Sequence, residues 1–190
     1  MGLILASKSP RRRELLDLLE IDYITYPSAI NEGISEENPE RLVMKLASMK
    51  ADFVAEKNLK DFVLAADTIV CLGKKVLGKP KDAADAKAML TLLSGKTHQV
   101  YTGVALKSVF YNYNKVIAEL TEVDFREIRP KELAEYIKSN EPFDKAGGYG
   151  IQGFAGVFVT AIRGSYHNVV GLPLAQTAKM LGEANLYKLW

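Results

Sequence analysis

The stretch LILASKSPRRRELLDLL, residues 3–19, decides the fold, because an apolar run passes directly into a helix start. Residues 3–6 are all apolar, which is typical of a short buried strand. Ser9 fits the N-cap of a helix and Pro10 its first position, and we expect this helix to run to about Leu19. A strand followed at once by a helix favours an α/β fold.

The rest of the chain continues the alternation of strands and helices. Residues 23–34 look extended or irregular. The pattern predicts helices over 38–57, 82–93 and 130–139 and from Pro173, and strands over 62–72, 98–110, 115–128 and 157–162, with a hairpin at 111–114. We find no repeat, low-complexity segment or linker, so residues 1–190 are expected to form one domain, an α/β fold with helices flanking a mixed sheet.

Composition restricts the classes of function. The chain is 48% hydrophobic and 25% charged, as in ordinary globular proteins, and its formal net charge of +2 by itself indicates neither a nucleic acid nor a membrane as partner. Cys71 is the single cysteine, which excludes an internal disulfide and a zinc cluster, and His98 and His167 are far apart. Without a signal-peptide pattern or a membrane-spanning run, we expect a cytoplasmic protein.

Three arginines occupy the first turn of the first helix. Arg11, Arg12 and Arg13 stand where the positive end of the helix dipole favours acidic residues. The arrangement is unfavourable unless an anion binds, and free backbone N–H groups with guanidinium groups suit a phosphate. The alternative, a solvated basic helix start, stays open.

Lys50 interrupts the apolar face of the second predicted helix. At about 100° per residue, it falls near the middle of an arc formed by Leu42, Val43, Leu46, Ala47, Met49, Phe53 and Val54. A lysine on a buried face needs a partner charge, so its ammonium is a candidate for an anion pocket. The alternative is that Lys50 extends past the core into solvent.

Asp67 lies inside the apolar run 63–70. A carboxylate in a buried strand must bind a metal, pair with a cation or accept backbone hydrogen bonds, and a turn-capping role is the structural alternative. Lys79 follows a short segment later. If the chain folds back there, Lys79 could approach Asp67.

A glycine-rich loop covers residues 144–153. Its glycines permit positive φ angles and close approach of the backbone to a ligand, and Gln152 could read a base edge with its amide. A plain surface loop is the alternative. Gly148, Gly150 and Gly153 match GxGxxG, but a strand-like run follows where a dinucleotide site needs a helix.

In their order and spacing, these segments resemble the Maf family of nucleotide pyrophosphatases, over nearly the whole chain. The segments that carry the resemblance are 5–16, 50–51, 66–68, 78–80, 93–98, 144–153 and 171–174. The resemblance implies a fold like those of Maf proteins and inosine triphosphatases, with two lobes around a deep central cleft. It also implies hydrolysis of a nucleoside triphosphate to the monophosphate and pyrophosphate.

The resemblance further implies a substrate and roles for individual residues. The loop Tyr149–Gly153 and the two arginines after Ser9-Pro10 are similar to the branch that acts on dTTP and UTP, whereas a sister branch that acts on 7-methyl-GTP lacks the glutamine. By position, the family's residues that set base choice correspond to Arg11, Thr68 and Gln152. The groups that line its phosphate site correspond to Ser7, Arg12, Lys50 and Lys79. Asp67 corresponds to the catalytic acceptor, and Glu32 to an acidic residue near the metal.

The expected cofactor is a divalent cation, Mg²⁺ or Mn²⁺ with Co²⁺ as a third candidate, held by Asp67 and Glu32 through oxygen ligands. Relatives often carry a second acidic residue before Glu32, where this chain has Asn31, so a ligand role for that neighbour is in doubt. Whether Asp67 acts as base, ligand or both is open. A homodimer is implied by family analogy alone.

Two other functions remain as alternatives. A non-catalytic nucleotide-binding regulator of cell division would share the basic helix start but would need neither Asp67 nor a metal. The same hydrolysis on 7-methyl-GTP is disfavoured by Gln152 and Arg11. An RNA or DNA binder has little support, because the basic residues form no stripe and no aromatic stacking platform is visible.

Overall fold

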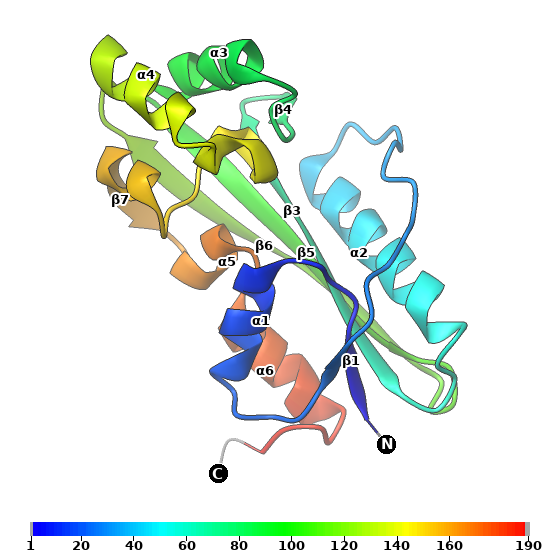
Figure 1. The fold of residues 1–190 in the computed structure, drawn as a ribbon. Helices are drawn as coiled ribbons and strands as arrows, with labels where there is room; N and C mark the ends of the chain where they lie inside the picture. The colour runs from blue at the N-terminus through cyan, green and yellow to red at the C-terminus, as the bar shows by residue number, and fades with distance from the viewer. Residues whose placement is uncertain (1, 189–190) are drawn as a thin grey trace. The chain divides into compact units, whose positions relative to one another are not determined.

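The structure is a computed structural model and describes residues 2–188. Its elements, labelled in Figure 1, are β1 (Leu3–Leu5), α1 (Pro10–Asp17), β2 (Ile24–Thr25), α2 (Pro39–Ala55), β3 (Phe62–Leu72), β4 (Lys75–Leu77), α3 (Ala83–Leu93), β5 (Thr97–Ser108), β6 (Tyr113–Phe125), α4 (Pro130–Lys138), η1 (Glu141–Asp144), η2 (Ala146–Gly148), η3 (Phe154–Phe158), β7 (Val159–Arg163), α5 (Tyr166–Val170) and α6 (Leu174–Glu183). No helix among the described residues is long and apolar enough to cross a membrane.

The strands form a seven-stranded mixed sheet. Their order is β2-β1-β3-β5-β6-β7, and β4 pairs with β3. β1 is fully buried and runs parallel to both neighbours, with Ile4 paired to Ile24 and to Val63. A parallel strand covered on both faces has an uninterrupted apolar sequence, which is what residues 3–5 show. The mixed sheet with helices confirms the predicted α/β class.

The chain divides into two compact units built from discontinuous segments. The first contains the residues up to Asp67, Thr102–Glu119 and the residues from Gly171 on, and the second contains Thr68–Tyr101 and Leu120–Val170. Three of the boundaries fall within β3, β5 and β6, and the fourth lies between α5 and α6.

Each unit has its own apolar core. In the first, α2 packs against β1 and β3 through small and β-branched residues, among them Ala47, Ala51 and Val54. In the second, Leu90 of α3, Phe125 of β6 and further aromatic residues form the centre. Figure 1 shows α3 and α4 of this second unit side by side, in agreement with their mutual contacts.

The helix starts of the first unit agree with the sequence. Ser9 caps α1 by accepting a hydrogen bond from the Arg12 N–H at 3.4 Å, Pro10 takes the first position, and the first turn has no acidic residue. Asn38 caps α2 by accepting from the Arg41 N–H at 3.0 Å. The end of the first helix differs from the prediction: α1 stops at Asp17 rather than at Leu19.

Short elements differ from the prediction. The chain folds back after β3 through Gly73, at φ +58°, and forms the unpredicted strand β4. The strand expected over 157–162 starts two residues late, because η3 covers Phe154–Phe158, and α5 was not predicted. Pro173 precedes α6 rather than lying in its first turn.

Candidate active site

The turn between β1 and α1 places two predicted site residues. Ser7 is buried, and its Oγ accepts a hydrogen bond from the Ser9 N–H at 3.1 Å. One turn later, the Arg12 Nε donates to the carbonyl oxygen of Gly171 at 2.9 Å. The Gly171 backbone has φ +126°, a conformation that side-chain-bearing residues avoid. This bond fixes the base of the guanidinium group and so limits the directions in which it can reach.

Arg12 is partly shielded from water, and carboxylates of opposite charge lie near its guanidinium group. Burial lowers the pKa of the Arg12 guanidinium from its ordinary value, and the carboxylate of Asp67 opposes that shift. Arg11 lowers the same pKa, and Glu32 raises it. The first turn of α1 therefore presents a half-buried guanidinium group whose pKa is affected by two carboxylates.

Lys50 is buried on the apolar face of α2, with 8% of its surface exposed. Its Nζ donates to Asp67 Oδ1 at 2.6 Å and lies 2.7 Å from Glu32 Oε1. The ammonium therefore meets two partner charges inside the protein. The expectation of a buried lysine with charged partners is confirmed, and extension into solvent is wrong.

Asp67 lies in β3 and is 7% exposed, as the apolar sequence around it predicts. Its charge is compensated by Lys50, which is one of the three partners that a carboxylate in a buried strand requires. The side chain of Glu32 is 56% exposed and comes from an irregular segment before α2. The Asp67 carboxylate is thus buried, whereas the Glu32 carboxylate is accessible to solvent.

The two carboxylates have the chemistry of a divalent-cation site. Asp67 Oδ1 and Glu32 Oε1 both lie within 2.7 Å of the same ammonium nitrogen, so two oxygens already converge on one positive charge. Oxygen ligands suit Mg²⁺ and Mn²⁺. Within residues 2–188 there is no group of three or more acidic, histidine or cysteine side chains placed to hold a metal. Asp67 and Glu32 are the two carboxylates here that could hold such a cation.

The predicted site residues are divided between the two units. The first unit brings together Arg12, Glu32, Lys50 and Asp67, with Arg11 close enough to affect Arg12. The second unit holds Thr68, Lys79 and Gln152. Thr68 directly follows Asp67 along β3 and is half-buried, whereas Lys79 and Gln152 are exposed.

The loop that carries Gln152 is anchored at two points before Gln152, both within the second unit. Gly147, at φ +69°, donates its N–H to the carbonyl of Gly78 at 3.0 Å. The hydroxyl of buried Tyr149 shares a hydrogen bond of 2.7 Å with His98 Nε2. Burial lowers the pKa of His98 to about 4, so the ring is neutral near pH 7 and serves as a structural partner. A plain surface loop would not have these anchors.

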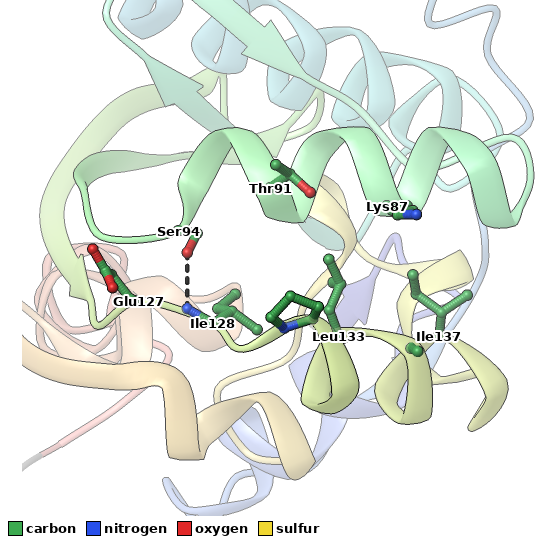
Figure 2. A pocket seen from close by; sticks show the side chains of 9 residues that line it. Lys87, Thr91, Ser94, Glu127, Ile128, Leu133 and Ile137 are labelled. Atoms are coloured by element: carbon green, nitrogen blue, oxygen red, sulfur yellow. Dashed lines mark hydrogen bonds between the residues drawn. The ribbon is translucent and has the colours of Figure 1, made fainter.

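A cavity of about 550 Å³ lies elsewhere in the second unit, between α3 and α4. Figure 2 shows Thr91 of α3 opposite Leu133 and Ile137 of α4, and Ser94 Oγ accepting from the Ile128 N–H at 2.8 Å. None of the predicted site residues lines this cavity. It is therefore separate from the candidate active site.

Two residues of the site were not recognised from the sequence. Gly171 contributes only a carbonyl oxygen, and no side-chain pattern indicates such a role, although its segment carried part of the family resemblance. Glu141 accepts a hydrogen bond from the Phe154 N–H, directly after the glycine-rich loop. No pattern in the sequence singled out this residue.

Several known proteins resemble this chain in sequence or in fold. The chain is 50% identical over 184 residues to the dTTP/UTP pyrophosphatase of Bacillus cytotoxicus, covering 94% of this chain and 93% of that protein. It is 48% identical over 185 residues to the dTTP/UTP pyrophosphatase of Bacillus cereus strain AH187, covering 97% and 96%. The HAM1 protein from Coxiella burnetii has the same fold, with a TM-score of 0.56, 21% identity, and coverage of 96% of this chain and 99% of that one.

The profile of the family described as Maf-like protein matches residues 2–184, which include every predicted site residue. The family match, the relatives at about half identity and the clustered charges of the first unit lead to one assignment. The chain is a member of the Maf-like protein family.

Proposed function

We propose that this protein hydrolyses dTTP and UTP to the nucleoside monophosphate and pyrophosphate with the help of a divalent cation. The observation that carries the proposal is that the buried Lys50 contacts both the buried Asp67 and the exposed Glu32, whose charges affect the pKa of Arg12. The names of the relatives at 50% and 48% identity support the choice of substrate.

The cations of the site match the charge of the substrate. A nucleoside triphosphate carries several negative charges, and displacement at phosphorus spreads that charge over the phosphate oxygens. Lys50 is buried and Arg12 is half-buried, and interactions of such cations with developing charge are stronger than in water. Ser7 and Lys79 complete the proposed phosphate-binding set.

Asp67 is the proposed proton acceptor. An attacking water forms a bond to the α-phosphorus, the bond from that phosphorus to the bridging oxygen breaks, and the water proton passes to a carboxylate oxygen of Asp67. Pyrophosphate leaves with the electron pair of the broken bond. Lys50 holds Asp67 Oδ1 in place and thereby fixes the orientation of the carboxylate.

Mg²⁺ or Mn²⁺, with Co²⁺ as a further candidate, is the proposed cofactor, and Asp67 and Glu32 are the side chains that would hold it. When bound, the cation would neutralise negative charge on the phosphate oxygens. Since Lys50 already contacts both carboxylates, its ammonium would share them with the cation.

Arg11, Thr68 and Gln152 are the proposed determinants of base choice. A side-chain amide can both donate to and accept from the edge of a pyrimidine, and Gln152 is exposed at the tip of an anchored loop. A site built on such hydrogen bonds discriminates against bases that leave them unmade.

The test is a comparison of kcat/KM for pyrophosphate release from dTTP, UTP, dGTP and 7-methyl-GTP. We expect dTTP and UTP to be preferred, and Gln152→Ala to reduce that preference. Preference for 7-methyl-GTP would move the protein to the sister activity. Absence of turnover with every substrate by folded protein would favour a non-catalytic nucleotide-binding role.

A further inference from the structure

Glu141 makes three contacts that join separate parts of the second unit. Its Oε2 accepts a hydrogen bond from the Phe154 N–H at 3.0 Å, and its Oε1 accepts from the Tyr136 hydroxyl at 3.2 Å. Its backbone carbonyl accepts from Lys145 Nζ at 2.7 Å. One side chain thus connects the loop to α4.

The loop backbone is packed closely against this carboxylate. A Cβ at Gly153 would lie 2.2 Å from Glu141 Oε1 and 2.6 Å from Oε2. A Cβ at Gly150 would lie 2.6 Å from Cε of Lys145 and 3.4 Å from Glu141 Oε1. Glycine at both positions therefore lets the loop approach the Glu141–Lys145 pair, and the carboxylate fixes where the loop backbone can lie.

The support behind Glu141 is rigid. Tyr136 is 1% exposed and belongs to the apolar core of the second unit. The Phe154 ring stacks on it, with centroids 5.9 Å apart and planes 17° apart. Displacement of the loop at Phe154 would break this stack and the hydrogen bond to Glu141 together.

Gln152 lies between two anchors. On one side is Tyr149 with its bond to His98, and on the other is Phe154 with its bond to Glu141. Four residues, 150–153, therefore span the gap, and Gln152 is exposed among them. A loop held this closely on both sides has few conformations available, which is the condition for reading a base edge by hydrogen bonds.

We propose that Glu141 is a positioning residue that fixes the Gln152 loop and thereby sets the base preference of the enzyme. This inference rests on the proposed function, in which Gln152 reads the pyrimidine. Glu141 acts on the backbone of Phe154 and on Tyr136 and is not offered to the substrate. Its loss should affect recognition of the base more than the chemistry at phosphorus.

The main test compares Glu141→Ala with Glu141→Gln in steady-state pyrophosphate release. We expect Glu141→Ala to raise KM for dTTP about tenfold and to lower the dTTP-to-dGTP ratio of kcat/KM at least about fivefold, with kcat changed by less than about threefold. Glu141→Gln should restore most of the preference, because its amide oxygen can accept from Phe154 N–H and its NH₂ can donate to Tyr136.

Two further variants test the contact from the other side. Gly153→Ala places a methyl group against the carboxylate and should lower the preference for dTTP as Glu141→Ala does. In the Gln152→Ala background, Glu141→Ala should cause no further loss of preference, since the residue that it positions is gone. Amide hydrogen exchange at Phe154 should rise in Glu141→Ala and return in Glu141→Gln.

The outcomes separate this inference from the proposed function. Unchanged dTTP preference in Glu141→Ala, beside a clear loss in Gln152→Ala, would overturn the role of Glu141 and leave the proposed function intact. A fall of kcat alone, equal for every base, would also overturn it. An inactive wild-type protein would contradict the proposed function, and unchanged Phe154 exchange in Glu141→Ala would then overturn the positioning role separately.

Discussion

At the scale of single residues, the pairing of Lys50 with Asp67 is more informative about function than about stability. Both side chains are about one-tenth exposed, and their charges are 2.6 Å apart. Removing two charges from water costs about as much as their attraction returns, so a buried ion pair is weak support for a stabilising role. The position of the Lys50–Asp67 pair beside Arg12 and Glu32 suits the binding of an anion and a cation.

Asp67→Asn tests the proposed proton acceptor. The amide oxygen can still accept from Lys50, so the fold should persist, whereas a neutral amide takes up no proton. We expect pyrophosphate release to fall by at least about 100-fold, with an unchanged circular dichroism spectrum. Glu135→Gln, an acid-to-amide change at an exposed side chain of α4, is the control and should retain full activity. Near-normal turnover of Asp67→Asn would remove this residue from the mechanism.

Lys50→Met should affect both binding and stability. The variant leaves the Asp67 carboxylate buried without its cation, which we expect to lower the free energy of unfolding by about 3 kcal/mol, and it should raise KM for dTTP. Urea denaturation and steady-state kinetics measure the two effects. Adding Asp67→Asn to Lys50→Met should recover part of the stability. If a folded Lys50→Met variant kept the wild-type KM and kcat, Lys50 would have no role in substrate binding.

His98 should make stability depend on pH. Burial lowers its pKa to about 4 from 6.5, so between these values the unfolded chain takes up a proton that the folded protein does not. Stability is therefore complete above about pH 6.5 and falls as the pH decreases, by up to about 3 kcal/mol at pH 4. Urea denaturation between pH 4 and 8 should show this slope, and His98→Gln should flatten it. Parallel curves for the two proteins would contradict the assignment.

The site residues that broke a local rule were the ones that the sequence could predict. Lys50 stood on an apolar arc and Asp67 in an apolar strand, and each had to meet opposite charge. The contact of Lys50 with Glu32 could not be predicted, because Glu32 comes from an irregular segment without periodicity. The carbonyl of Gly171 has no side chain to reveal it.

At the scale of elements, α2 positions Lys50 through unusually close packing on β5. A Cβ at Gly103 would lie 2.2 Å from the Val43 carbonyl oxygen and 2.8 Å from the Met44 nitrogen, which are backbone atoms of α2. Backbone cannot move aside as a side-chain end can. Gly103 therefore sets the distance between α2 and β5. This distance in turn determines how far the Lys50 side chain reaches into the candidate active site.

Gly103→Ala should consequently be costly. We expect a loss of about 2–3 kcal/mol in the free energy of unfolding and a higher KM for dTTP, because α2 must shift. Gly182→Ala in α6 is the matched control. Among residues 2–188, and apart from the backbone of α6 itself, its added Cβ meets only the Tyr187 carbonyl oxygen at 3.6 Å, so alanine should stabilise α6 by up to about 1 kcal/mol. Equal stabilities of the two variants would show that the close approach at Gly103 has no importance.

Long elements with a clear period were predictable, and short ones were not. The caps Ser9 and Asn38 marked two helices, and the apolar runs marked the long strands. β4 has three residues and is defined by its antiparallel pairing with β3, so its own sequence carries too little signal. η3 depends on the turn bond from Gly156 N–H to the Gly153 carbonyl, at 3.0 Å, within a segment that looked like a strand.

At the scale of the whole molecule, the bounds of the two units could not be predicted from composition or loop signals, although the family resemblance implied two lobes. Each unit is assembled from distant segments, and the chain crosses between them within β3, β5 and β6 and once more between α5 and α6. Changes in composition and loop-forming residues reveal a domain boundary only where the chain passes from one unit to the other a single time. The predicted site residues are distributed over both units, which explains why they appeared in the sequence as separate short motifs.

The central claim is that this chain catalyses metal-dependent hydrolysis of dTTP and UTP. Its most direct test is pyrophosphate release from dTTP and UTP by purified protein, after treatment with EDTA and again after addition of Mg²⁺ or Mn²⁺. The account predicts turnover that is absent without the cation and restored by it, with thymidine or uridine monophosphate as the second product. Folded protein that releases no pyrophosphate from either substrate with any of the cations would contradict it.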